Sequence, residues 1–485
     1  MSGELTVIVL AAGGGTRMKS KTMKVLHPVA GRSMVGHVLA AVQEVQPRLI
    51  VAVVGHQRDQ VGPHIHALVP DALLAVQEEQ RGTGHAVRIA MEAVAAHGES
   101  PEGTVLVAYA DTPLLQAESL RRFAAEHEAA QRAVSILSGR VDDPHGYGRV
   151  VRNGDGEVEG IVEEKDATEE QRAIREINSG ILAFDAAFLL EALPRLSNDN
   201  ANGEYYLTDT VHLARAAGLH VGAHEIDDVL QTEGVNDRVQ LARTGRVMNE
   251  RIVTRWMQAG VTVMDPATTW VDADVVLRPD VTLLPGVQLL GATVVAEDAV
   301  IGPDTTLKDC EIGSGARVVR THGELAVVGT DASVGPFAYL RPGTTLGDTG
   351  KIGTFVETKN AQIAEGAKVP HLTYVGDAEI GAGSNIGAGT KVPHLSYIGD
   401  ADVGAGTNLG AATITANYDA KTKTKSRTTI GADVRTSVDT TLVAPVSLGD
   451  GAYTAAGSVV TSDVPGKALA IARARQRNIE GYADR

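Results

Sequence analysis

The chain has 485 residues, of which 43% are hydrophobic and 21% are charged. This balance is typical of a folded globular protein and excludes a mainly disordered one. The formal net charge of −16 argues against a non-specific nucleic-acid binder, which needs a basic surface. The single cysteine, Cys310, excludes an intrachain disulfide and a cysteine-built zinc site.

The N-terminus carries no basic segment ahead of its first apolar run, Leu5–Ala12. That run is too short to span a membrane. We therefore expect a cytoplasmic protein with no membrane association.

The first half of the chain alternates strand-like and helix-like segments. Charge-free runs at Leu5–Ala12, Leu49–Val54 and Val105–Tyr109 are separated by helical stretches such as Met34–Val45 and Gly84–His97. This alternation predicts a Rossmann-like α/β domain with a mostly parallel sheet. Ligands of such sheets lie at the carboxyl ends of the strands.

The second half follows a six-residue period. After a predicted linker helix at 237–260, an aliphatic residue followed by glycine recurs, as at Ile301-Gly302, Ile312-Gly313, Val334-Gly335, Val403-Gly404 and Leu448-Gly449. Three such hexapeptides make one triangular coil of about 18 residues, which predicts a left-handed parallel β-helix. The expected domains are therefore 1–236, the linker at 237–260 and the β-helix at 261–485.

A tandem duplication interrupts this period. Residues 368–390 read KVPHLTYVGDAEIGAGSNIGAGT, and residues 391–413 read KVPHLSYIGDADVGAGTNLGAAT. The two copies have the same length, and each is longer than the expected coil.

A glycine-rich loop, Gly13–Met18, follows the first predicted strand. Backbone N–H groups of such a loop can reach phosphate oxygens. The side chains of Arg17 and Lys24 could neutralise the charge that develops on a transferred phosphoryl group. The loop matches neither a Walker loop nor the dinucleotide fingerprint.

The longer string LAAGGGTRM…KVLH resembles the signature of the sugar-phosphate nucleotidyltransferase family. Two positions depart from the family pattern, Met23 in place of proline and Ala110 in place of glycine. The resemblance makes Arg17 and Lys24 catalytic. It implies substrate contacts in this half at Leu10, Ala11, Gly13, Gln77, Gly82, Thr83, Tyr109, Gly148, Glu163 and Asn178.

The same resemblance implies that Asp111 and Asn236 bind Mg²⁺. The chemistry agrees, because Mg²⁺ prefers a few protein oxygen ligands completed by substrate phosphates and water.

Together, the two halves resemble the bifunctional N-acetylglucosamine-1-phosphate uridyltransferase/glucosamine-1-phosphate acetyltransferases of bacterial cell-envelope synthesis. The resemblance covers nearly the whole chain. It implies acetyl transfer from acetyl-CoA to glucosamine-1-phosphate, followed by Mg²⁺-dependent uridylyl transfer from UTP to N-acetylglucosamine-1-phosphate. It also implies a homotrimer built through the β-helix, with acetyl-CoA bound largely across the trimer interface.

In the β-helix, the sequence separation of Arg341 and Lys359 equals one expected coil, so they should stack one coil above the other. By resemblance these two cations clamp the acceptor phosphate, and His371 is the base that takes a proton from the amine. Tyr374 and Asn385 would hold the sugar. The implied acetyl-CoA contacts are Ala388, Asn417, Tyr418, Ala456 and Arg473.

The duplication leaves two candidates for the base. His371 keeps the family's spacing from Lys359, whereas His394 keeps the family's spacing to Asn417. We favour His371, because it follows the phosphate clamp, and His394 is the alternative. If the extra residues form one more coil, the clamp and Asn417 move apart by one rung of about 4.8 Å.

Three other functions remain open at this stage. The first is a uridylyltransferase whose β-helix only forms the trimer, which is favoured by the duplication and by Val438 at a position where the family has serine. The second is a regulatory binding protein without activity, which the presence of Lys24 and Asp111 disfavours. The third is a nucleotidyltransferase for a different sugar, which the segments KVLH and EGVN disfavour.

Overall fold

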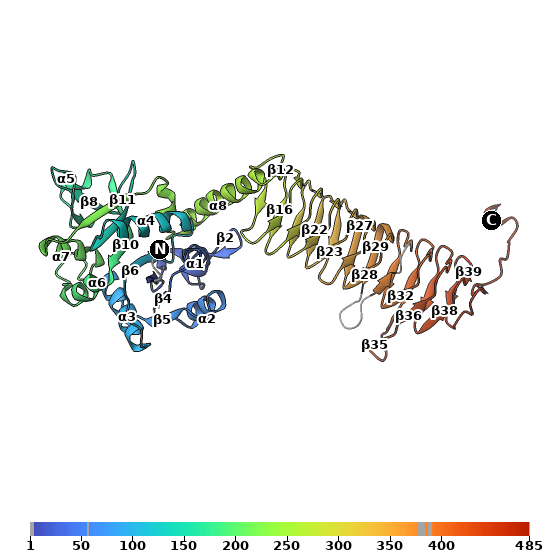
Figure 1. The fold of residues 1–485 in the computed structure, drawn as a ribbon. Helices are drawn as coiled ribbons and strands as arrows, with labels where there is room; N and C mark the ends of the chain where they lie inside the picture. Colours follow the sequence, from blue (N-terminus) through green and yellow to red (C-terminus); the bar gives the residue numbers. More distant parts are fainter. Residues whose placement is uncertain (1–3, 56–57, 377–383, 387–389, 485) are drawn as a thin grey trace. The chain divides into compact units, whose positions relative to one another are not determined.

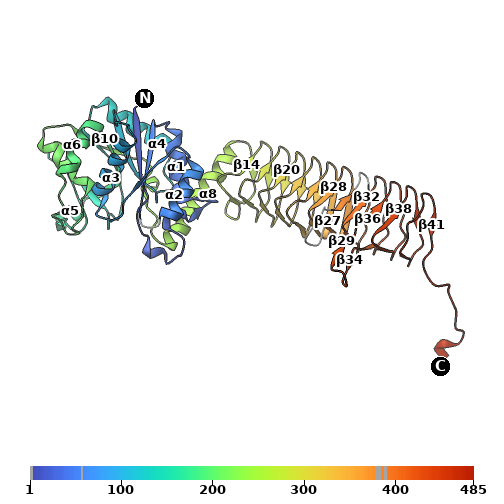
Figure 2. The ribbon, with the colours of Figure 1, turned by 90° about the horizontal axis from the view of Figure 1, so that it is seen from below.

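The computed structural model describes residues 4–55, 58–376, 384–386 and 390–484, with residues 384–386 described in their backbone only. The chain divides into two compact units, Met1–Met248 and Asn249–Arg485. Figures 1 and 2 show an α/β unit and a stack of short strands.

The first unit is built on a mixed sheet with the strand order β11-β7-β10-β6-β1-β4-β5. Strand β1 is parallel to β4 and β6, whereas β10 is antiparallel to β6 and β7. These strands are β1 (Leu5–Leu10), β4 (Leu49–Val54), β5 (Leu73–Val76), β6 (Thr104–Tyr109), β7 (Val134–Arg140), β10 (Glu176–Asp185) and β11 (Val221–Glu225). The predicted α/β fold with a mostly parallel core is confirmed.

Helices cover both faces of this sheet (Figure 1). Val7 and Val9 of β1 join the core under α1 (Met34–Glu44), α2 (Arg58–Leu68) and α4 (Ala117–Ala129). Ile8 points to the opposite core, under α3 (Thr83–Ala96), α6 (Ala186–Ala192) and α7 (Thr210–Ala216). Because successive strand residues face opposite sides, a strand buried on both faces needs the charge-free sequence seen here.

Smaller elements extend the sheet on one side. Strand β8 pairs with β10 and with β9. The remaining elements of this unit are β2 (Pro28–Val29), β3 (Arg32–Ser33), β8 (Gly148–Arg152), β9 (Val158–Val162), α5 (Glu169–Arg172) and the short 3₁₀ helices at 16–18, 24–26, 193–195, 207–209 and 229–232.

The predicted linker segment at 237–260 contains α8 (Arg238–Gln258). The division between the two units falls within this helix. Ile252 and Val253 are buried. The role of the segment as a linker stays a prediction.

The second unit is the predicted left-handed β-helix, running from β12 (Thr262–Val263) to β41 (Leu469–Ala470). Parallel strands of successive coils pair at a nearly constant sequence spacing at most steps, as in Val300↔Arg317 and Ser333↔Lys351. The aliphatic residues predicted to point inward are buried, namely Ile301, Ile312, Val334, Val403 and Leu448. Cys310 is buried among them, as expected of a structural thiol.

Two coils depart from this spacing among the pairings of the described residues. Lys368 pairs with Lys391, so the first duplicated copy forms one enlarged coil. Asn408 pairs with Arg435, and this coil carries the projecting hairpin of β34 (Tyr418–Asp419) and β35 (Thr424–Lys425) (Figure 2). The duplication therefore adds one complete coil to the stack.

The strands that hold the duplication and its neighbours are β25 (Ala338–Leu340), β27 (Lys351–Lys359), β28 (Ala361–Ile363), β29 (Lys368–Gly376), β30 (Ser384–Ile386), β31 (Tyr397–Gly399), β32 (Ala401–Val403) and β33 (Ile414–Ala416).

Candidate active sites

The glycine-rich loop leaves the carboxyl end of β1 and packs against Lys24. Gly15 has φ 59°, and a Cβ built there would overlap the Cβ of Lys24. Only glycine tolerates both the left-handed backbone and this close approach. Gly13 and Gly14, in contrast, face open space, which leaves their backbone accessible to a ligand.

Three side chains that are far apart in the sequence converge beside this loop. The Nζ atom of Lys24 donates hydrogen bonds to Oδ2 of Asp111 at 2.5 Å and to Oδ1 of Asn236 at 3.1 Å. The side chains of Lys24 and Asp111 are only 11% and 17% exposed. The ammonium group thus contacts both of the oxygens that the family resemblance predicts to bind Mg²⁺.

Backbone contacts hold the two oxygen donors in place. The N–H of Val235 donates to the carbonyl of Asp111 at 2.9 Å, and the N–H of Asn236 donates to Oε1 of Gln240 at 2.7 Å. The carboxylate oxygen of Asp111 and the amide oxygen of Asn236 already face one cationic group. These two oxygens therefore fit as ligands of Mg²⁺, which takes its remaining ligands from phosphates and water.

A cavity of about 280 Å³ opens beside the loop. Lys24 and Asp111 are among the residues that line it. Of the residues predicted to bind substrate, it is lined by Leu10, Gly13, Gln77, Gly82, Thr83 and Tyr109. The Gln77 amide is buried and donates to the carbonyl of Gly82 at 3.2 Å. This hydrogen bond ties the Gln77 side chain to the backbone of Gly82 at the cavity wall.

A second cavity of about 390 Å³ shares Tyr109 and Asp111 with the first. It is lined by the other predicted residues of this half, namely Arg17, Gly148, Glu163, Asn178 and Asn236. The two cavities meet at Asp111, so groups bound in them would face each other across the Lys24–Asp111–Asn236 cluster.

The second cavity has polar walls. Burial raises the pKa of Glu163, while a hydrogen bond from Thr208 at 3.4 Å acts in the opposite direction. Asn178 lies where the pairing of β10 with β7 shifts register, and its Oδ1 accepts from the N–H of Gly180 at 3.0 Å. Such irregularities often aim side chains into a site.

The two departures from the family pattern cause no visible strain. Met23 has φ −57°, which lies in the range that proline imposes. Ala110 is not among the residues with positive φ, and its N–H donates to the carbonyl of Leu10 at 3.1 Å. The strain that glycine would relieve at Ala110 is therefore absent.

One predicted residue lies outside both cavities, and several lining residues were not predicted. Ala11 is buried, and its N–H donates to the carbonyl of Val53 at 2.8 Å. Gln80 and Glu204 line the first cavity, whereas Thr232 and Gln240 line the second. Gln80 and Glu204 belong to motifs visible in the sequence, but Gln240 sits on a helix whose pattern indicates only packing.

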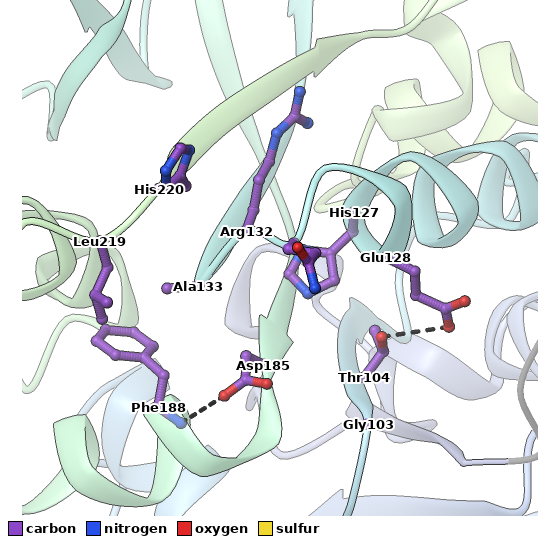
Figure 3. A pocket seen from close by; sticks show the side chains of 11 residues that line it. Gly103, Thr104, His127, Glu128, Arg132, Ala133, Asp185, Phe188, Leu219 and His220 are labelled. Atoms are coloured by element: carbon purple, nitrogen blue, oxygen red, sulfur yellow. Dashed lines mark hydrogen bonds between the residues drawn. The ribbon is translucent and has the colours of Figure 1, made fainter.

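A third cavity, of about 410 Å³ (Figure 3), lies at the ends of the strands opposite to those that carry the first two cavities. Thr104 begins β6 and Asp185 ends β10 there. Burial, aided by the charge of Arg132, lowers the pKa of His127 to about 4. None of the residues predicted to act in the reaction lines this cavity.

In the β-helix, the predicted phosphate clamp occupies neighbouring coils. Leu340 pairs with Thr358, which places Arg341 beside Lys359. The guanidinium of Arg341 donates to Oε1 of Glu357 at 2.9 Å. This ion pair is partly exposed, and it orients the arginine along the face that carries both cations.

The two histidines of the duplication stack on each other. The rings of His371 and His394 have centroids 4.8 Å apart and planes 10° apart. The rings of Tyr374 and Tyr397 stack in the same way at 5.3 Å. The copies therefore repeat the same side-chain arrangement on adjacent coils.

Four of the five predicted acetyl-CoA residues lie beyond the second copy, whereas Ala388 belongs to the first copy. Gly376 pairs with Gly399, and the pairing of Tyr397 with Ile414 continues this register to Ala416. Asn417 is buried and donates from Nδ2 to Oδ2 of Asp400 at 2.5 Å.

The remaining acetyl-CoA residues differ in their surroundings. Tyr418 and Arg473 are exposed, whereas Ala456 is half-buried. Ala388 lies outside the described residues, and Asn385 is described only in its backbone, within β30.

An α/β sheet with this loop and the Lys24–Asp111–Asn236 cluster, followed by a hexapeptide β-helix, defines a nucleotidyltransferase joined to an acyltransferase. A family model described as a MobA-like NTP transferase domain matches residues 7–178. Proteins named "Bifunctional protein GlmU" match nearly the whole chain. The one from Pseudarthrobacter chlorophenolicus is 53% identical over 99% of this chain and 92% of its own length.

Two further relatives carry the same name. The protein from Streptomyces avermitilis is 52% identical over 99% of this chain and 94% of its own length. The protein from Kineococcus radiotolerans is 54% identical over 98% of this chain and 91% of its own length. The chain belongs to the GlmU family of bifunctional proteins. It is an enzyme, which excludes the inactive regulatory protein considered from the sequence.

Among the residues that the structure describes, no helix is both long and apolar enough to cross a membrane. Within the same residues, no group of three or more His, Cys, Asp or Glu side chains could hold a metal ion.

Proposed function

We propose that the two units act on one sugar phosphate in two steps of UDP-N-acetylglucosamine synthesis. The β-helix acetylates glucosamine-1-phosphate with acetyl-CoA, and the α/β unit then joins N-acetylglucosamine-1-phosphate to the uridylyl group of UTP. The full-length relatives do not favour the alternative in which the β-helix is only a scaffold. The product serves cell-wall synthesis.

The observation that carries the uridylyl step is the meeting of two cavities at the Lys24–Asp111–Asn236 cluster. The first cavity would hold UTP and the second the sugar phosphate. The sugar phosphate oxygen attacks the α-phosphorus, the bond to the β-phosphate breaks, and pyrophosphate leaves. Lys24, and Arg17 at the rim, stabilise the negative charge that spreads over the phosphates.

Asp111 and Asn236 are the residues that would hold Mg²⁺. The bound ion adds positive charge and orients the phosphates. Its support here is the donor pair that already faces the ammonium group of Lys24.

For the acetyl step, we assign Arg341 and Lys359 to the acceptor phosphate and His371 to the base. The amine nitrogen attacks the thioester carbonyl, His371 accepts the amine proton, and CoA leaves as its thiol. The support is the register that puts His371 on the coil directly after Lys359. Tyr374, Asn417, Tyr418, Ala456 and Arg473 would surround the two substrates.

A homotrimer fits an exposed apolar stripe on one corner of the β-helix. Phe337, Phe355, Leu372 and Leu395 occupy successive coils at this corner and are 53%, 59%, 48% and 62% exposed. Exposed apolar stripes of this kind mark interaction surfaces. Sedimentation of the full chain tests the trimer, and a monomer in solution would contradict it.

Two assays on one purified sample test the proposed function. The first measures the thiol released from acetyl-CoA with glucosamine-1-phosphate. The second measures the pyrophosphate released from UTP and N-acetylglucosamine-1-phosphate with Mg²⁺. We expect both products, and the absence of either would reject the corresponding half of the proposal.

A further inference from the structure

The duplication inserts one coil between the proposed acceptor and donor residues. Lys359 pairs with Gly376, and Gly376 pairs with Gly399. The coil of His371 therefore follows the clamp directly, and the coil of His394 comes next. Asn417, on the donor side, belongs to the coil after that.

The geometry of the acceptor, glucosamine-1-phosphate, determines which histidine can act as the base. This assignment rests on the proposed function. Glucosamine-1-phosphate carries its phosphate and its amine on adjacent ring carbons, so their separation cannot stretch. With the phosphate at Arg341 and Lys359, the amine reaches the coil of His371, whereas His394 is one further rung of about 4.8 Å away.

The acetyl donor, acetyl-CoA, is flexible, whereas the acceptor sugar is rigid. The pantetheine arm of acetyl-CoA is a flexible chain with two amide groups. Its thioester must still reach His371, although Asn417 and Tyr418, which are proposed to bind CoA, lie two coils beyond that histidine. We propose that the arm crosses the added coil, and that His394 and Tyr397 position it there.

The side chains of the added coil suit this role. A Cβ on Gly399 would lie 2.7 Å from the hydroxyl of Tyr397, so this hydroxyl lies over the glycine, in the column that continues from Lys359. His394 is half-buried, and its carbonyl accepts from the N–H of Ala412 at 3.0 Å, which ties its coil to the next. A hydroxyl and an imidazole can both hydrogen-bond amide groups.

The geometry of the two histidines argues against a shared proton. Their rings are stacked nearly parallel, and ring N–H groups point in the plane of the ring. Neither nitrogen therefore aims a proton at its neighbour, since a hydrogen bond needs an almost linear approach. His394 acts through the donor and not as a relay to His371.

The kinetics of single substitutions separate these roles. We expect His371→Ala to lower kcat of acetyl transfer by about 10²-fold or more. We expect His394→Ala to raise KM for acetyl-CoA by about 5- to 20-fold, with kcat and KM for glucosamine-1-phosphate nearly unchanged. Uridylyl transfer by the same sample is the internal control, and His97→Ala, an exposed histidine of the other unit, controls for loss of an imidazole.

Conservative substitutions add a readout that a purely structural role would not give. His394→Gln keeps a hydrogen-bond donor and should recover part of the affinity for acetyl-CoA. Tyr397→Phe keeps the ring stack and should raise the same KM. The proposal is overturned if His394→Ala abolishes kcat, or if it leaves the KM for acetyl-CoA unchanged.

Deletion of residues 391–413 separates failure of this inference from failure of the proposed function. The deletion brings Asn417 to the family's spacing from His371, so KM for acetyl-CoA should fall. If only the deletion variant releases thiol, the arm does not cross the added coil and the inference is wrong, while the assigned acetyl site survives. If neither protein releases thiol, the proposed acetyl site itself is wrong.

Discussion

The Nζ atom of Lys24 lies 2.5 Å from Oδ2 of Asp111, although the two residues are distant in the chain. Lys24 follows the loop after β1, and Asp111 follows β6, the parallel neighbour of β1. The carboxyl ends of adjacent parallel strands meet at one edge of the sheet, which is where ligands of α/β folds bind. This ion pair therefore lies at the centre of the proposed nucleotidyltransferase site.

Replacing Lys24 tests its electrostatic role. Lys24→Ala should lower kcat/KM of uridylyl transfer by about 10²- to 10³-fold, because a buried positive charge beside the reacting phosphates is lost. Lys21→Ala, an exposed lysine three residues earlier, is the matched control. Equal effects of the two substitutions would show that Lys24 contributes only to the general positive charge of the loop.

Asp111→Asn tests the proposed metal ligand. The substitution keeps the shape of the side chain but removes its charge, so the Mg²⁺ concentration that gives half-maximal pyrophosphate release should rise about tenfold or more. Acetyl transfer by the same protein should be unchanged. An unaltered Mg²⁺ dependence would exclude Asp111 as a ligand.

The close packing of the loop predicts different outcomes for two neighbouring glycines. Gly15→Ala should lower the free energy of unfolding by roughly 1–3 kcal/mol, because it adds left-handed strain and an overlap with Lys24. Gly14→Ala should leave stability unchanged, since a Cβ there meets nothing within 4 Å. Thermal unfolding of both variants is the measurement, and equal midpoints would contradict this account of the loop.

The lowered pKa of His127 predicts that the folded protein loses stability in mild acid. Burial lowers the pKa of His127 to about 4 in the folded state, whereas the unfolded value is about 6.5. Between these values the unfolded chain binds more protons, so stability falls as pH decreases through this window, by on the order of 2–3 kcal/mol.

His127→Asn removes the titrating group behind this acid sensitivity. Denaturant unfolding at pH 7 and pH 5 should show a smaller pH dependence for His127→Asn than for the unaltered chain. The same dependence in both proteins would assign the acid sensitivity to other groups.

Strands and buried positions could be predicted well from the sequence, because charge-free runs and a regular six-residue period mark them. The charge-free run Leu49–Val54 is β4, with identical bounds, and the hexapeptide aliphatic residues are buried. The glycine-rich loop and most residues of the two cavities also follow from motifs that can be read along the chain. Gln240 was not predicted, because its side chain lies on α8 and accepts a hydrogen bond from the N–H of Asn236, in the turn that precedes this helix.

The sequence by itself determined the fold class and the duplication, since these depend on local pattern, and its resemblance to a known family predicted the residues of both sites. Only the tertiary structure decided that Asp111 and Asn236 share the ammonium of Lys24, and that the second copy forms an added coil with His394 stacked on His371. Contacts between distant segments depend on strand register and on the path of the chain between them. The number of residues between two segments limits the possible registers and paths, and side-chain packing determines which of them forms.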